Sequence, residues 1–140
     1  MASPSTVLVP SLDTTRDVDL LEYTCETFPN ADVTVLAIVT PIDNPLSEGR
    51  ILERRSDRIE SARSRTRSLV ETAAVDTDRV AVAIVQGRPS SAIPAYARDH
   101  GFDHIVVRKA TSHRWLRTLL GRDVGTTVAH RSSVPVTLVE

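Results

Sequence analysis

The sequence has few cysteines, few aromatics and no long apolar run, and each scarcity excludes a class of protein. A single cysteine, Cys25, rules out an internal disulfide. No apolar run approaches the ~18 residues of a membrane-spanning helix, and Met1-Ala2-Ser3-Pro4 lacks the basic and apolar segments of a secretory signal. A net charge of −1 gives no general attraction to nucleic acid or to an anionic membrane. We therefore expect a cytoplasmic protein that binds neither of them.

Motifs of catalysis are also missing from the sequence. It contains no nucleophile elbow, no Walker-type glycine and lysine loop, and no histidine and carboxylate spacing for a metal. The four histidines, His100, His104, His113 and His130, fall in separate contexts at a helix end, a strand start, a loop and a surface. Cys25 lies in a helical pattern, where a small buried side chain is expected. The expectation is a protein that is not an enzyme, with no catalytic residues and no metal ligands.

Short β-branched runs alternate with helical patterns along the whole chain. A length of 140 residues with 41% hydrophobic content suits one core, so residues 1–140 are expected to form a single domain. Strands are expected at 6–9, 32–39, 80–85, 104–107 and 134–139, and helices at 17–28, 46–75, 92–100 and within 115–131. This order predicts an α/β fold, an open doubly wound five-stranded parallel sheet of order 3-2-1-4-5 with helices on both faces, Rossmann-like in architecture.

A ligand of such a sheet binds beyond the carboxyl ends of the strands, where the winding direction reverses. That point lies between the first and fourth strands, so residues 10–16 and 108–114 are expected to flank it. The second of these segments contains no glycine. Positive charge gathers there instead, on Arg108, Lys109, His113, Arg114, Arg117 and Arg122. These side chains either hold an anion, as arginine does without a glycine nest, or are solvated.

Three segments of the sequence resemble the universal stress protein family, over nearly the whole chain. They are Val7-Leu8-Val9-Pro10, then Gln86-Gly87-Arg88-Pro89-Ser90-Ser91-Ala92-Ile93 with its continuation to Val107, and Leu119-Leu120-Gly121 with Ser132-Ser133-Val134-Pro135-Val136. The resemblance implies a stress-response protein that forms a homodimer through its last strand. The sequence supports the same contact, because the apolar strand with Val134, Val136 and Leu138 would otherwise leave an open sheet edge.

Members of that family that bind ATP are recognised by Gly, two residues, Gly, nine residues, Gly, then Ser or Thr. Glycines at these positions let backbone N–H groups approach phosphate oxygens. The four positions fall here on Arg108, Thr111, Gly121 and Arg122, so one glycine remains. The family's nucleoside-contacting aspartate is matched only by Asp13, one residue beyond its usual place, and a step of one residue reverses side-chain direction in an extended segment. No cofactor is therefore expected.

Three hypotheses about function follow from the resemblance and the altered loop. The first is a non-catalytic stress-response or regulatory homodimer that does not bind ATP in the usual way. The second is a nucleotide-binding member in which ATP or another adenine nucleotide occupies an arginine-rich phosphate site. Its residues would be Asp13, Arg108, Lys109, Thr111, Gly121 and Arg122. The third is an enzyme of the adenine-nucleotide hydrolase type, which the lack of a catalytic constellation disfavours.

Overall fold

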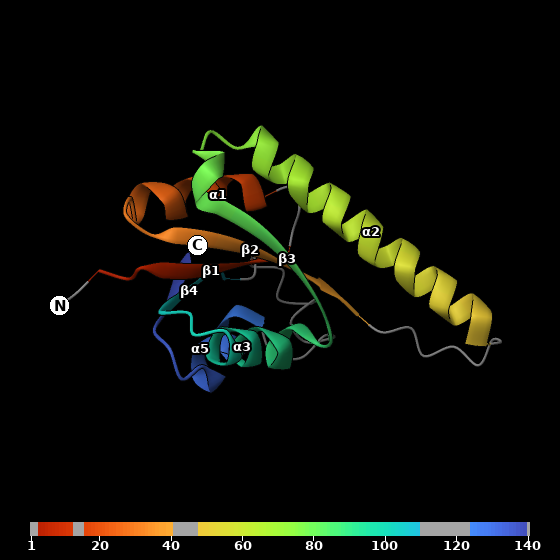
Figure 1. Ribbon diagram of the computed structural model, residues 1–140. Coiled ribbons are helices and arrows are strands. Elements are labelled where there is room, and N and C mark those ends of the chain that lie inside the picture. Colours follow the sequence, from red (N-terminus) through yellow and green to blue (C-terminus); the bar gives the residue numbers. More distant parts are fainter. Residues whose placement is uncertain (1–2, 13–15, 41–47, 110–123, 140) are drawn as a thin grey trace.

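The computed structural model describes residues 3–12, 16–40, 48–109 and 124–139 (Figure 1). The strands are β1 (Thr6–Ser11), β2 (Asp32–Val39), β3 (Val80–Gln86), β4 (His104–Arg108) and β5 (Val136–Val139). The α-helices in the described ranges are α1 (Asp17–Thr27), α2 (Glu48–Thr72), α3 (Pro89–Asp99) and α5 (Val124–Arg131), and a short 3-10 helix, η1 (Thr77–Arg79), precedes β3. All strand pairs are parallel and the order is β3-β2-β1-β4-β5, which confirms the predicted fold class.

The central strand β1 is buried because helices cover both faces of the sheet. Figure 1 shows α1 and α2 on one face and α3 and α5 on the other. Successive side chains of a strand point to opposite faces, so Val7 and Val9 pack with α1 and α2, and Leu8 packs with α3 and α5. Cys25 belongs to the first of these two core layers and is 8% exposed, as the helical pattern predicted. Nearly continuous apolar strands are typical of a parallel sheet covered on both sides.

Helix α2 is the longest helix and buries only one narrow stripe. Ala62, Thr66 and Leu69 recur at three- and four-residue steps and are buried, whereas Arg65 and Arg67 between them are exposed. The Thr66 hydroxyl donates to the backbone O of Ala62 at 2.7 Å, so the polar group in the buried stripe has a partner. The N-terminal part of α2 projects past the strands (Figure 1). Within the described ranges, no helix is long and apolar enough to cross a bilayer.

The last strand is shorter than predicted and does not include Val134 or Pro135. Strand β5 begins at Val136. Proline has no N–H to contribute to a ladder, although the carbonyl O of Pro135 accepts a hydrogen bond from the N–H of Ile105 at 3.0 Å. Val134 packs, half-buried, against the core on the α3 and α5 side. Of the three residues predicted for a dimer strand, Val136 and Leu138 therefore lie in β5, and the placement of Val134 there was wrong.

Two glycines adopt backbone conformations that other residues avoid, and they mark both ends of α3. Gly87 has φ +146° and turns the chain from β3 toward α3, which begins at Pro89 rather than at the predicted residue 92. Gly101 has φ +70° just after the end of α3. It follows the C-cap residue His100 and takes the left-handed conformation in which many helices end.

Candidate functional site

The carboxyl ends of β1 and β4 meet where the winding of the sheet reverses. Strand β1 pairs with β2 on one side and with β4 on the other. Arg108 is the last residue of β4, and its Nη2 donates a hydrogen bond to the backbone O of Arg16 at 3.2 Å. Arg16 immediately precedes α1. This bond places the start of α1 beside the end of β4, which is the crevice that strand order predicts for a ligand.

A buried carboxylate lies at the same end of the sheet. Asp17 is the first residue of α1, is 3% exposed, and accepts a hydrogen bond from the Ser11 hydroxyl at 2.6 Å. A carboxylate in the first turn interacts favourably with the unpaired N–H groups and with the dipole of the helix. The start of α1 thus carries an acidic side chain of the chain itself.

A cleft of about 200 Å³ opens beside β1 on the α2 side of the sheet. Residues from the end of β1, the second half of β2 and α2 line it: Ser11, Leu12, Ala37, Ile38, Ala62, Arg65, Thr66 and Leu69. The hydroxyls of Ser11 and Thr66 are already engaged, because they donate to the Asp17 carboxylate and to the backbone O of Ala62. The cationic group of the lining is Arg65. The cleft is smaller than the ~300–1,000 Å³ of typical small-molecule sites, so it matches a ring system better than a whole nucleotide.

The structure brings two of the predicted nucleotide residues to the crevice. Arg108 spans it as described above, and Lys109 follows with an exposed side chain. The N–H of Lys109 is engaged with the backbone O of Val139 at 2.7 Å. The other four predicted residues, Asp13, Thr111, Gly121 and Arg122, lie outside the described residues.

Several residues at this end of the sheet were not among the sequence-predicted site residues. Arg65 follows Ala62 by three residues on α2, so helical periodicity would have placed it near the buried stripe. The contact of Ser11 with Asp17 depends on the path of the connection between β1 and α1. No spacing rule for helices or strands predicts such a loop contact.

A second group of polar contacts lies at the opposite, amino end of the strands. The Asp103 carboxylate accepts hydrogen bonds from the hydroxyl and the N–H of Ser5 at 2.6 and 3.0 Å, and these bonds lower the pKa of Asp103. The Nε2 atom of His104 lies 2.7 Å from the Thr137 hydroxyl, and its ring packs 5.1 Å from the ring of Phe28. Burial lowers the pKa of His104. These contacts join the ends of β1, β4 and β5 far from the crevice, so their role is structural.

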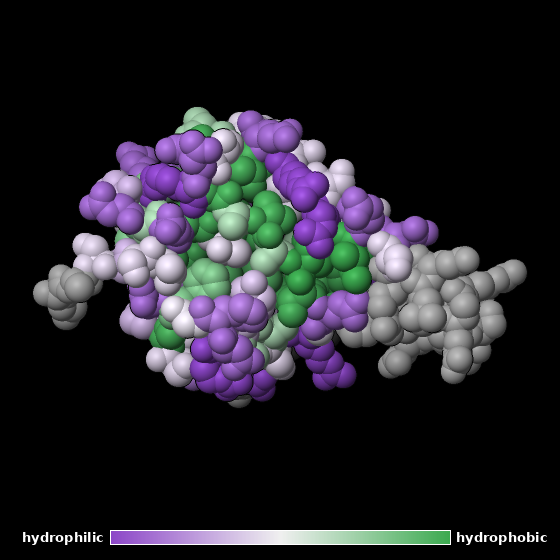
Figure 2. All heavy atoms as spheres, in the orientation of Figure 1, coloured by the Kyte–Doolittle hydropathy of each residue, from purple (hydrophilic) through white to green (hydrophobic). Residues whose placement is uncertain are grey.

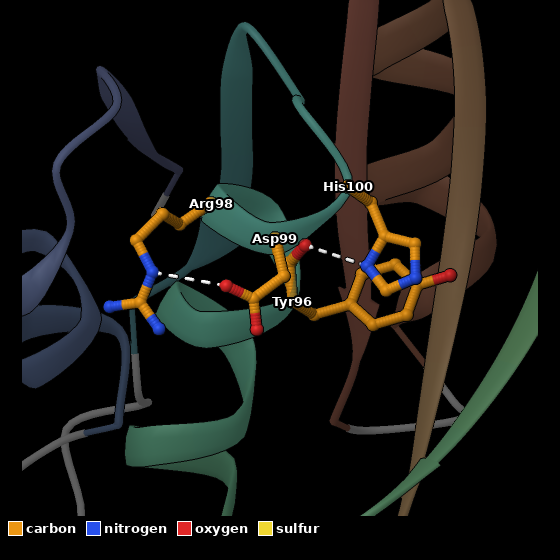
Figure 3. Close-up of polar contacts among 4 residues, drawn as sticks. All are labelled: Tyr96, Arg98, Asp99 and His100. Carbon is orange, nitrogen blue, oxygen red and sulfur yellow. Dashed lines mark hydrogen bonds and ion pairs between the residues drawn. The ribbon is translucent and has the colours of Figure 1, made fainter.

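Helix α3 ends in a cluster of polar side chains that looks like a site but has a structural explanation (Figure 3). The rings of Tyr96 and His100 are stacked with centroids 3.9 Å apart, and the Nδ1 atom of His100 lies 3.1 Å from the backbone O of Tyr96. Arg98 pairs with its neighbour Asp99 at 3.1 Å, and both side chains are exposed. Such contacts satisfy the last turn of a helix. Within the described ranges, no three His, Cys, Asp or Glu residues are grouped so as to hold a metal.

Comparisons with known proteins agree with this fold. The universal stress protein family model matches residues 5–140. The chain is similar to the universal stress protein UspA from Lactobacillus plantarum, with 20% identity, a TM-score of 0.73 and coverage of 100% of both chains. No curated protein matches the sequence.

Two further solved structures that resemble the chain were determined with nucleotides. One is a universal stress protein in complex with cAMP, with 21% identity, a TM-score of 0.71 and coverage of 99% of both chains. The other is a universal stress protein family protein from Arabidopsis thaliana with AMP bound, with 16% identity and a TM-score of 0.54. That match covers 97% of this chain and 91% of the other. At these identities the likeness concerns the fold.

Proposed function

The chain belongs to the universal stress protein family, and on that premise we propose that it is a non-catalytic stress-response or regulatory protein acting as a homodimer. The observation that carries this proposal is the outer edge of β5. The strand lies at one end of the sheet order, and no described strand lies beyond it. An apolar edge of this kind is a template for pairing with another strand.

The backbone groups of Val136 and Leu138 point away from the sheet. Hydrogen bonds run from the N–H of Ile105 to the O of Pro135 and from the N–H of Lys109 to the O of Val139. Alternate residues of a strand direct their N–H and C=O groups to opposite sides, so the residues between these two acceptor carbonyls of β5 alternate in direction. Val136 and Leu138 fall on the outward positions, and Leu138 is 40% exposed.

Antiparallel pairing of β5 with β5 of a second copy would use these outward groups and cover Leu138. The test is the solution mass of Leu138→Asp beside wild type, with Leu138→Ala as the matched control. In Leu138→Asp, pairing would bring two like charges close together, which disfavours association. In Leu138→Ala, the side chain is uncharged and the backbone pairing is kept. Val136→Asp tests the same edge, but Val136 also packs against the core, so Leu138 is the cleaner position. A dimer of unchanged mass and affinity in both aspartate variants would refute this interface.

We also propose that the protein does not hold ATP by the family's glycine pattern. The sequence supports this, since Arg108, Thr111 and Arg122 stand at three of the four pattern positions. The absence of catalysis is a separate part of the proposal, and it is tested by incubating the protein with ATP and separating the nucleotides by chromatography. Accumulation of ADP or AMP that depends on the protein would overturn it.

The cleft beside α2 favours a second candidate, an adenine nucleotide bound through arginine. Its lining offers apolar surface for a ring and one guanidinium, that of Arg65, for a phosphate or a polar ring edge. Arg108, at the end of β4, lies at the same end of the sheet. The similarity to structures determined with cAMP and AMP agrees with this choice of ligand.

Thermal shift with ATP, ADP and AMP distinguishes the two candidates. A ligand that binds only the native state raises the melting temperature, by an amount equivalent to about 2.7 kcal/mol at a concentration of 100 times Kd. The matched variants are Arg65→Gln in the cleft and Arg98→Gln on the exposed end of α3. A shift lost only in Arg65→Gln would establish the arginine site. No shift at millimolar nucleotide would eliminate the second candidate and leave the first.

A further inference from the structure

Strand β3 forms the edge of the sheet opposite to β5, and it is the longer of the two. Its seven residues, Val80 to Gln86, are all half-buried or exposed, although six of them are apolar. Figure 2 shows a band of hydrophobic residues between α2 and α3, where β3 runs in Figure 1. Natural edge strands are usually blunted by charge, proline or a bulge, and β3 contains no charged residue and no proline.

The outward backbone groups of β3 belong to its even-numbered residues. The N–H of Gly87 donates to the O of Val39 at 3.1 Å, so the odd-numbered residues direct their backbone groups toward β2. Val82, Ile84 and Gln86 therefore present their N–H and C=O groups away from the sheet. Val80 presents its C=O there, while its N–H is engaged with the O of Thr77. A strand added at this edge would find a continuous row of donors and acceptors.

We propose that β3 is an interaction surface for a second copy of this chain, which pairs with it antiparallel through its own β3. In a two-fold arrangement centred on Ala83, Val82 of one copy faces Ile84 of the other, and Val80 faces Gln86. Val82 and Ile84 can exchange both of their hydrogen bonds, and the C=O of Val80 can accept from the N–H of Gln86, while the N–H of Val80 stays with Thr77. The edge is thus complementary to itself in this register, as a two-fold contact requires.

The charges at the two ends of β3 favour this antiparallel partner. Asp76 and Asp78 are exposed just before the strand, and Arg88 is exposed just after it. Arg79 directly precedes β3, but its guanidinium is engaged with the backbone O atoms of Phe28 and Ala31. Antiparallel pairing about Ala83 brings the acidic end of one copy beside Arg88 of the other, twice per contact. Parallel pairing of the same strands would instead set acid beside acid and arginine beside arginine, which is repulsive.

The contact at β3 is separate from the proposed contact at β5, because the two strands are opposite edges of one sheet. A copy that uses both edges joins two neighbours rather than one. The wild-type protein is therefore expected to form species larger than a dimer as its concentration rises. Leu138→Asp would limit assembly to β3-linked dimers.

The first test places a charge on the β3 edge without touching the core. Ala81 is exposed and faces Val85 of the second copy in this register, so Ala81→Lys inserts a lysine into the contact. Ala81→Gln is the matched control, similar in length but uncharged. Sedimentation of each variant in the Leu138→Asp background should show that lysine weakens the dimer about tenfold or more, while glutamine changes it much less. Equal masses for the two variants, or a monomer for Leu138→Asp itself at all concentrations, would overturn the proposal.

The second test uses the charges at the strand ends. Asp78→Arg alone and Arg88→Asp alone should each weaken the β3 dimer about threefold to tenfold, because each sets like charges side by side. The double variant Asp78→Arg with Arg88→Asp restores opposite charges with reversed sign, and should recover most of the affinity. These positions are exposed, so all three variants are expected to fold. A double variant no tighter than the weaker single variant would refute this register.

Discussion

The guanidinium of Arg108 donates a hydrogen bond to the backbone carbonyl of Arg16 across 92 residues of sequence. The sequence comparison predicts Arg108 at the first glycine position of the family's nucleotide pattern. A glycine there would leave backbone N–H groups open to a phosphate, whereas this side chain reaches over to the start of α1. Arg108 therefore makes an internal contact at the crevice.

Replacing Arg108 with methionine should lower the free energy of unfolding by about 1–2 kcal/mol, because a hydrogen bond from a charged donor is lost. Lys109→Met is the control, since the Lys109 side chain is exposed and its backbone bond to Val139 is kept. Urea unfolding measures both variants. Similar losses in the two would show that the contact with Arg16 contributes nothing to stability.

Arg79 should contribute more to stability than an exposed arginine. Its Nη2 donates to the backbone O atoms of Phe28 and Ala31 at 2.7 and 2.8 Å, which connects η1 to the turn after α1. Arg79→Met should cost about 1–2 kcal/mol, because two carbonyls lose a charged donor and the site is only partly buried. Arg98→Met should change stability by less than about 0.5 kcal/mol, because its one ion pair is exposed. Thermal unfolding of the two variants measures their losses of stability, and equal losses would contradict the prediction.

The burial of His104 predicts a loss of stability in mild acid. Burial lowers the pKa of this histidine in the folded protein, so the unfolded chain binds a proton at higher pH than the folded chain does. Stability is then fully present above the unfolded pKa of about 6.5 and falls as the pH drops below it. His104→Gln keeps a polar partner for Thr137 and removes the titration. Urea midpoints from pH 8 to pH 5 should fall more steeply for wild type, and parallel curves would disprove this assignment.

At Gly125, helix α5 lies close against the sheet. A Cβ atom added there would lie 2.9 Å from the backbone O of Arg108 and 3.2 Å from the Leu138 side chain. Gly125→Ala should therefore destabilise the protein by about 1–3 kcal/mol, because the obstructing atom is backbone and cannot turn aside. Alanine in an exposed helix would have been favourable. A melting temperature equal to or above that of wild type would show that α5 shifts freely.

The sheet order and the two core layers could be predicted from the sequence because periodicity encodes them directly. Val7, Leu8 and Val9 read as a strand covered on both faces, and their side chains pack alternately into the two core layers. The last strand was set two residues too early, because an apolar run of six residues that includes Pro135 does not reveal where its ladder begins.

The candidate site was less accessible to sequence reasoning than the fold. Strand order located the crevice, and Arg108 lies in it. The contact of Ser11 with Asp17 depends on how a loop folds back on a strand, and the cleft beside α2 depends on the small size of Ala37 and Ala62 on facing elements. Neither follows from a local pattern. Both required the packing of segments that are distant in sequence.

Because Cys25 is buried, the reactivity of its thiol reports local opening of the protein. Burial raises the pKa of this thiol, and the chain has no other cysteine, so a thiol reagent has one slow target in the native state. Labelling then proceeds only from conformations in which α1 has separated from the sheet. Its rate, followed with and without nucleotide, would measure how firmly the layer that carries Arg16 and Asp17 is held, without any engineered probe.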